Sequence, residues 1–398
     1  MCPTLFTIPW VNWPIRGYGM MLMVAFLAGT WWASRRAARV KQDPDFVVNI
    51  GFVALICSVV GARLFYVAHY WERFEGRSLW DMVNLTAGGM EFYGGYIGAM
   101  VGILAFMLLR RVSIRLYLDI LAPSLMLGMA AARIGCFLNG CCWGAPAPPQ
   151  GLPWAVRFPY ASPAQHRQWE DRMMTLPAEL IAVYNSGQAY PLGRDLLDNS
   201  DKAVAAHLLR WQKAQTELKN AQAGGADSAT LAKLNRQVDR AKKQLEAGEQ
   251  TIQPLQIQAQ RFDISVGQLE RMARAGAYQS LPVHPAQLYA SLDGLVMALL
   301  LSAIFYRRKR HGVVFGITML LYPLCRIVEE IIRIDNPHDA AGLTISQFVS
   351  LPGIIIGIVW LVAIYRMPIR SPRAVPFVWP PEPEPAPKKR GKKGRWGG

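Results

Sequence analysis

Two arginines lie inside apolar segments that are long enough to cross a membrane. Arg133 comes late in the apolar stretch 116–138, and Arg326 lies within the stretch 313–333. A cation at membrane depth costs on the order of 3 kcal/mol or more, so it faces a protein interior or a water-filled cavity and usually marks function. Either arginine taken singly is also explained by a side chain that reaches the lipid headgroups. Two such helices together favour an anionic ligand.

Helical spacing gathers other polar groups beside the second arginine. Tyr322, Arg326 and Glu330 are spaced by four and share one helix face, and Arg333 follows three residues later. In the simpler interpretation, Arg326 and Glu330 form an ion pair that only fastens the helix into a bundle. In the functional interpretation, Glu330 orients the guanidinium group toward a ligand. Because that planar group binds phosphate through paired, charge-assisted hydrogen bonds, a phosphate is the favoured ligand.

Transmembrane helices must position these residues. The 398-residue chain is 52% hydrophobic with a mean hydropathy of +0.15, which is typical of a polytopic membrane protein with some soluble mass. The first apolar stretch lacks a basic leader and a cleavage site, so we expect a true span there. The sequence predicts an all-α fold with seven transmembrane helices at 17–33, 47–70, 88–109, 116–138, 286–306, 313–333 and 343–365.

Basic residues gather in every second connection, and this sets the expected orientation. The clusters that follow the first, third, fifth and seventh spans are Arg35, Arg36, Arg39 and Lys41; Arg110, Arg111 and Arg115; Arg307, Arg308, Lys309 and Arg310; and Arg366, Arg370 and Arg373. Because such clusters mark the cytoplasmic side, the N-terminus is predicted outside and the C-terminus inside. The net charge of +16 is therefore no argument for nucleic-acid binding.

The remaining sequence divides the chain into four expected parts. Residues 1–143 carry spans one to four, 144–283 form an extracytoplasmic head or cap, 284–366 carry spans five to seven, and 367–398 form a disordered basic cytoplasmic tail. Within the head, apolar residues recur at helical spacing on both sides of a glycine-containing break near Asp227 and Ser228, which predicts a coiled helical hairpin at about 200–250. The flanking portions 144–195 and 254–283 are expected to be irregular.

The predicted orientation places many polar residues at one depth, near the outer leaflet. Asn139-Gly140 is expected to end its helix, with Gly140 in the left-handed conformation. The glycine run that includes Gly94 and Gly95 is explained by close helix packing, or by backbone N–H groups that bind an anion. The residues expected to gather at this depth are Tyr18, Arg63, Tyr93, Gly94, Gly95, Arg133, Asn139, His284, Gln287, Tyr289, Arg326 and Glu330.

Six cysteines are too few and too scattered for a disulfide framework. Cys136, Cys141 and Cys142 cluster, but no histidine lies nearby in sequence and the chain has no CxxC pair. We therefore expect no metal site and no cofactor.

Together these segments resemble the prolipoprotein diacylglyceryl transferases. The matching pieces occur in the family's order: Tyr18-Gly19, Gly61-Ala62-Arg63, Phe92 to Gly98, Arg133-Ile134-Gly135 through Asn139-Gly140, His284 to Tyr289, and Tyr322 to Arg333.

The resemblance implies seven spans in the bacterial cytoplasmic (inner) membrane with the N-terminus outside and the active site toward the outer leaflet. It implies transfer of the sn-1,2-diacylglyceryl group from phosphatidylglycerol to the lipobox cysteine thiol of prolipoproteins, with release of glycerol phosphate. The expected partners are phosphatidylglycerol, prolipoprotein precursors and membrane lipids, with no nucleic acid. The family's functional residues include those matching Tyr18, Asn139, Gly144 and Glu330, besides the headgroup-binding Arg133 and the essential Arg326.

Two departures from the family pattern affect the expected chemistry. Tyr93 stands where many members have a histidine proposed as the base, and Cys136 and Cys141 stand where the signature often has Asn and Glu. We expect Tyr93 to orient the headgroup or the thiol, since a phenol is a poor base near neutral pH, with His284 in reserve as a proton acceptor.

The predicted catalytic residues are Arg133, Arg326 and Tyr93. The predicted substrate-binding residues are Arg133, Tyr18, Arg63, Gly94, Gly95, Asn139, Gly144, His284, Tyr289, Tyr322 and Glu330.

Two other functions compete with this prediction. A cysteine-dependent membrane acyltransferase would carry the acyl group on one of the clustered cysteines, but it needs a nearby base that the local sequence does not supply. A lipid or anion transporter would use the same arginines. Transporters tend to show internal repeats and polar groups near the midplane, whereas this sequence has no evident repeat and its polar groups lie toward one side.

Overall fold

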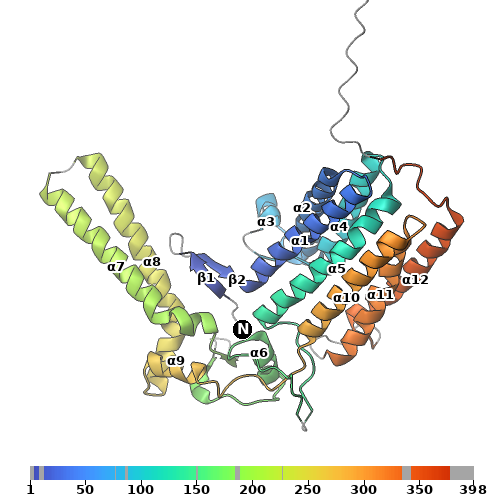
Figure 1. Ribbon diagram of the computed structural model, residues 1–398. Coiled ribbons are helices and arrows are strands. Elements are labelled where there is room, and N and C mark those ends of the chain that lie inside the picture. The colour runs from blue at the N-terminus through green and yellow to red at the C-terminus, as the bar shows by residue number, and fades with distance from the viewer. Residues whose placement is uncertain are drawn as a thin grey trace, which may run out of the picture. The chain divides into compact units, whose positions relative to one another are not determined.

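The computed structural model describes residues 4–8, 13–76, 78–85, 88–148, 151–183, 189–225, 227–333 and 342–376, and it is mostly helical (Figure 1). The chain divides into two compact units. The bundle unit comprises Gly19–Arg133, Ala290–Glu330 and His338–Gly398, and the head unit comprises Met1–Tyr18, Ile134–Tyr289 and Ile331–Pro337.

The long helices of the bundle unit lie where the apolar stretches predict them, and the short helix α3 lies outside those stretches. They are α1 (Gly17–Arg39), α2 (Pro44–His69), α3 (Leu79–Val83), α4 (Phe92–Leu109), α5 (Ile114–Asn139), α10 (Ala286–Arg307), α11 (Val313–Ile332) and α12 (Ile345–Arg366), with a 3-10 turn η1 at Trp71–Arg73. Among the described residues, α2, α5, α10 and α12 are each long and apolar enough to cross a membrane. The predicted class, a mostly helical polytopic membrane protein, is confirmed.

Helices α2 and α4 pack through glycines. A Cβ on Gly61 would collide with the carbonyl oxygen of Gly94, and one on Gly98 would collide with the carbonyl oxygen of Cys57. Close approach of backbones increases van der Waals contact, which is a main source of helix association where lipid removes the hydrophobic drive. The packing explanation of the glycine run is therefore confirmed.

Arg36 lies inside the bundle unit, although the sequence analysis placed it in a basic connection. It belongs to α1, is 1% exposed, and donates to the Ile120 carbonyl and the Ser124 and Ser302 hydroxyls. Its guanidinium carbon also lies 5.4 Å from the centre of the Phe305 ring. The helix runs farther than the apolar stretch, so this arginine is carried into the interior, where its two terminal nitrogens donate to neutral acceptors.

A second cation of the expected basic connections is also buried. Arg308 approaches Asp119 with 2.7 Å between Nε and Oδ2, and the Asp119 side chain is fully buried. The same carboxylate accepts hydrogen bonds from the backbone N–H groups of Gly312 and Phe315 at the start of α11. Asp119 therefore ties α5 to the connection between α10 and α11 and caps α11.

The head unit contains the short elements and the longest helices. Its elements are β1 (Thr4–Ile8), β2 (Trp13–Arg16), α6 (Pro163–Glu170), η2 (Ala178–Leu180), β3 (Ile181–Val183), β4 (Ala189–Pro191), α7 (Arg194–Ala223), α8 (Ser228–Arg261) and α9 (Val266–Arg274). Strands β1 and β2 pair antiparallel, as do β3 and β4.

The predicted helical hairpin is present as α7 and α8, which lie side by side (Figure 1). Asp227 caps α8 by accepting a hydrogen bond from the Thr230 backbone N–H, and Gly225 takes a positive φ of 69° in the turn. The hairpin is longer than expected, because α8 continues to Arg261.

The expectation of irregular structure from residue 254 onward is wrong. Pro254 lies inside α8, and Leu255 and Ala259 are buried in the core of the head unit together with Leu269 of α9. Burial of these apolar side chains outweighs the backbone hydrogen bond that the proline removes. From residue 377 onward, the predicted tail lies outside the described residues.

We predict that Asp119→Ala lowers the thermal unfolding midpoint of the detergent-solubilised protein strongly. It leaves the buried Arg308 cation uncompensated, a change that typically costs about 3–5 kcal/mol. Glu246→Ala, which removes the exposed pair with Lys242 on α8, is the control and should cost less than about 1 kcal/mol. Equal midpoints for the two variants would contradict the assignment.

Candidate active site

Arg326 of α11 is held by two carboxylates and a hydroxyl. Its Nη1 lies 3.3 Å from Oε2 of Glu329, and its Nη2 lies 2.8 Å from Oε2 of Glu330 and donates to the Ser346 hydroxyl at 3.0 Å. The arginine is 9% exposed and Glu330 is 3% exposed. The predicted Arg326–Glu330 pair is therefore present, and Ser346 fixes it against α12.

Glu329 connects the two arginines that the sequence analysis singled out. Its carboxylate interacts electrostatically with Arg133 of α5 as well as with Arg326. Glu329 was not among the predicted residues, because the four-residue spacing pointed to Glu330. The spacing of three from Arg326 was the available signal, since positions three and four apart are both neighbours on a helix surface.

Further polar groups lie around this cluster. Asp293 of α10 hydrogen-bonds with the thiol of Cys325 and lies close enough to Glu329 to interact electrostatically. Tyr93 of α4 interacts electrostatically with Arg326, Glu330 and Tyr322. The five helices α4, α5, α10, α11 and α12 thus each contribute a polar side chain, and all three predicted catalytic residues belong to this cluster of the bundle unit.

Arg63 is engaged differently. Although buried, it directs its guanidinium group at backbone carbonyls, donating to Met82 and Asp81 at 2.7 Å each and to Gly88 and Gly89. These contacts hold α3 and the segment between α3 and α4 against α2. The structure accounts for Arg63 by this role, and its binding of substrate stays a prediction.

Gly94 and Gly95 lie in the first turn of α4, against α2. A Cβ on Gly94 would collide with Phe65, and one on Gly95 would lie 3.1 Å from the Ser58 hydroxyl oxygen. The Gly95 N–H is bonded to the Glu91 carbonyl. Packing accounts for both glycines, and their predicted contact with substrate remains untested.

In the head unit, His284 belongs to a short chain of hydrogen bonds. Its Nδ1 lies 3.3 Å from the Tyr289 hydroxyl, and that hydroxyl accepts a hydrogen bond from Nε1 of Trp154 at 2.7 Å. With its oxygen occupied by the Trp154 donor, the tyrosine can donate its own proton to the imidazole. The sequence analysis did not identify Trp154, because it lies far away in the chain.

Gly144 lies where two backbone segments approach each other. Its N–H donates to the His284 carbonyl at 3.0 Å, and the His284 N–H returns a bond to the Ala145 carbonyl at 2.9 Å. A Cβ on Gly144 would lie 2.8 Å from the His284 Cβ and 3.2 Å from the Ile332 carbonyl oxygen. Only glycine fits here, so its function is at least to permit this close approach.

Asn139 and Gly140 end α5 as predicted. Gly140 has a φ of 75°, and its N–H bonds to the Cys136 carbonyl at 2.9 Å. The Asn139 side chain is exposed and hydrogen-bonds with the Cys141 thiol. Tyr18, in the first turn of α1, is 41% exposed.

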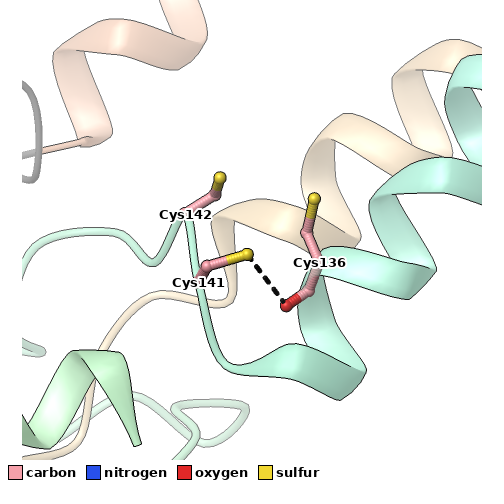
Figure 2. Close-up of side chains that lie close together, drawn as sticks. All are labelled: Cys136, Cys141 and Cys142. Atoms are coloured by element: carbon pink, nitrogen blue, oxygen red, sulfur yellow. Dashed lines mark hydrogen bonds between the residues drawn. The ribbon is translucent and has the colours of Figure 1, made fainter. Parts of the chain in front are cut away.

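The three clustered cysteines come together in this turn (Figure 2). The sulfur atoms of Cys136, Cys141 and Cys142 all lie within 4.8 Å of one another, and the Cys141 thiol points at the Cys136 carbonyl oxygen, 3.7 Å away. None of the described cysteines is in a disulfide.

The predicted site residues are thus divided between the units. Tyr93, Arg133, Tyr322, Arg326 and Glu330 form one cluster in the bundle unit. Tyr18, Asn139, Gly144, His284 and Tyr289 belong to the head unit. Their convergence on one substrate stays a prediction.

The family model for prolipoprotein diacylglyceryl transferase matches residues 3–198 and 220–363. The chain belongs to this family. Enzymes named phosphatidylglycerol–prolipoprotein diacylglyceryl transferase are similar over most of their length: that of Rhodopirellula baltica is 28% identical, with 88% of this chain and 73% of the relative covered. That of Ralstonia pickettii is 26% identical, with 88% and 90% covered. A relative from Chloroflexus aggregans is 34% identical over 39% of this chain and 48% of its own.

Family membership favours the transferase prediction over a transporter or a cysteine-dependent acyltransferase. The segment that the family model leaves unmatched, 199–219, lies within α7. The match resumes at residue 220, still within α7, so the interruption falls on one arm of the hairpin.

We predict that Gly144→Ala lowers both the thermal midpoint and the transfer activity, because the added Cβ forces the His284 and Ile332 backbones apart. Gly267→Ala in α9 is the matched control, since a Cβ there meets no atom closer than 3.9 Å. The test is to measure transfer activity and the thermal unfolding midpoint of both purified variants. Wild-type values for Gly144→Ala would refute the close approach.

Proposed function

We propose that this chain transfers the sn-1,2-diacylglyceryl group of phosphatidylglycerol to the thiol of a lipobox cysteine in prolipoproteins. Membership of the diacylglyceryl transferase family supports the reaction. The observation that carries the assignment of residues is the shared partner Glu329, which interacts with both Arg133 and Arg326. Arg326 pairs with this carboxylate and Arg133 interacts with it electrostatically, which supports an action of both cations on one anionic group.

The reaction forms a carbon–sulfur bond and breaks a carbon–oxygen bond. The thiol sulfur attacks the glycerol carbon that bears the phosphate, glycerol phosphate leaves with the electron pair, and the thiol proton passes to the surroundings. Negative charge therefore builds on the departing phosphate. Arg133 and Arg326 would stabilise this charge in a site with little water, where fixed cations have their largest effect.

The carboxylates near the arginines fit this mechanism as orienting groups. A guanidinium group has five N–H donors, and Arg326 needs only some of them for Glu329, Glu330 and Ser346. The others remain for phosphate oxygens. Held from several sides, the guanidinium plane is preorganised for the transition state, which lowers the reorganisation needed during reaction.

Tyr93 would orient a reacting group, and its electrostatic interaction with Arg326 supports this role. A cysteine thiol has an unperturbed pKa of about 8.5, so thiolate is a minority species at neutral pH but accessible. Nearby cations favour thiolate further. A strong general base is therefore not required, and His284, linked to Tyr289 and Trp154, is the reserve proton acceptor in the head unit.

We further propose seven membrane spans in a bacterial cytoplasmic membrane, with α1, α4 and α11 added to the four long apolar helices. The N-terminus lies outside, residues 144–283 form the extracytoplasmic head, and the C-terminus lies in the cytoplasm. The distribution of basic clusters supports this orientation. The substrates then reach the site from the outer leaflet.

We predict that Arg133→Ala and Arg326→Lys each reduce transfer from phosphatidylglycerol to a lipobox peptide by roughly 100-fold or more, as loss of a charge-stabilising donor does in other enzymes. Lysine keeps the charge of Arg326 but not the planar fork. Released glycerol phosphate is the readout. Arg110→Ala, which removes an exposed arginine at the far end of α4, is the control for fold and activity. Full transfer by Arg133→Ala would refute the assignment.

We predict that Tyr93→Phe keeps partial transfer, and that its rate rises with pH as the peptide thiol ionises. Rates between pH 7 and pH 9 measure this. Complete inactivity at pH 9 in a variant that elutes and melts like the wild type would show that the phenol does more than orient.

A further inference from the structure

The three thiols at the end of α5 are arranged as ligands. In Figure 2 the sulfur of Cys141 lies between those of Cys136 and Cys142, and all three are on the same side of the turn. Their mutual separations are within 4.8 Å. A metal bound by thiolates at about 2.3 Å holds its sulfurs about 3.8–4.0 Å apart. The thiols therefore need to close by no more than about 1 Å.

The backbone of Cys142 is unusual and helps to build this arrangement. Its φ of 59° lies in the left-handed region, which costs a residue with a Cβ roughly 1–2 kcal/mol and is routine only for glycine. This conformation turns the Cys142 side chain toward the side on which Cys136 lies (Figure 2). A strained, non-glycine residue that brings a third sulfur to two others is typical of a functional site.

The turn is also fixed from outside. Gln287 of α10 donates its side-chain amide to the Cys141 carbonyl at 2.6 Å, and Gly144, two residues after Cys142, is bonded to His284. Cys136 belongs to the last full turn of α5. All these residues are in the head unit, so the three ligands sit on a supported framework, as a metal site requires.

We infer that Cys136, Cys141 and Cys142 bind one thiophilic metal ion with a filled d shell, monovalent copper or zinc. Thiolates select these ions over magnesium or calcium. Binding replaces three S–H protons, which go to solvent, by three metal–sulfur bonds, and no electron is transferred. Among the described residues, the cluster offers no fourth histidine, cysteine or carboxylate. Three thiolates complete a trigonal copper site, whereas zinc would keep one position for water.

The sequence analysis expected no metal here because the cysteines have neither CxxC spacing nor a neighbouring histidine. The structure supplies what spacing did not show: a helix end and a left-handed residue bring positions 136, 141 and 142 together. A bound ion would cross-link the end of α5 to the loop that carries Gly144. It would thereby fix Asn139 and Gly144, two predicted substrate-binding residues, without itself taking part in the transfer.

The test is metal content and thiolate ligation in the full-length, detergent-purified protein, kept reduced with a phosphine. We expect about one zinc or copper per chain by mass spectrometry of the metals. After chelation, Co²⁺ added as an optical probe should give thiolate-to-cobalt charge-transfer absorption. Competition with a zinc indicator and with a copper(I) chelator then distinguishes the two ions.

Three variants decide whether the cluster is the site. Cys136→Ser removes one ligand, and Cys142→Gly removes another while relieving the left-handed backbone, so that misfolding cannot explain its effect. Each should weaken metal binding beyond the roughly 10- to 100-fold that loss of an outer partner costs. Cys57→Ala on α2, a half-buried cysteine outside the cluster, should bind like the wild type.

The inference is overturned if the reduced wild type binds no more metal or Co²⁺ than Cys136→Ser does. It is also overturned if intact mass shows a disulfide within the cluster and the reduced protein takes up no metal. Because the readouts are metal content and absorption, neither result depends on the proposed transfer reaction.

Discussion

Charge compensation in an apolar interior is the constraint on which the candidate site depends. A guanidinium group taken out of water is tolerated only when other groups replace its solvation. Arg326 meets this condition through Glu329, Glu330 and Ser346, and Glu329 in turn interacts with Arg133. Each partner comes from a fixed place on α5, α11 or α12. The need to pair charges therefore decides which helix faces turn toward one another, and the same pairing preorganises the cations for an anionic substrate.

The other buried arginines obey the same constraint by different means. Arg36 uses a carbonyl and two hydroxyls, Arg63 uses backbone carbonyls of α3 and of the segment after it, and Arg308 uses the carboxylate of Asp119. Where partners are neutral or belong to the backbone, the arginine has no donor arrangement aimed at a ligand and serves the fold. Around Arg326, two carboxylates and a hydroxyl fix the orientation of the guanidinium group. What distinguishes Arg326 is the polar cluster around it, in which Glu329 also interacts with a second cation, Arg133.

The sequence predicted the positions of the transmembrane helices, but only some of the contacts between side chains. Apolar runs indicate helix positions because apolar side chains are favoured both against lipid and in the protein core. Each expected span accordingly has a helix in the structure. The Arg326–Glu330 pair followed from spacing along one helix. Glu329 was missed because the four-residue spacing pointed to Glu330, and Trp154 was missed because its partner Tyr289 lies far along the chain. The role of Arg63 depends on carbonyl groups of α3 and of the segment after it, whose positions no periodicity encodes. Pro254 misled the analysis, since burial of Leu255 and Ala259 outweighs a local helix-breaking signal.

The hairpin of α7 and α8 offers a consequence of another kind. With 34 residues, α8 is about 51 Å long at 1.5 Å per residue, and α7 is its main packing partner among the described residues. Paired helices of this type keep their interlocking when both arms gain or lose about seven residues together. The length of such a hairpin can therefore change by whole heptads, in evolution or by design, while the packing between its two helices is kept.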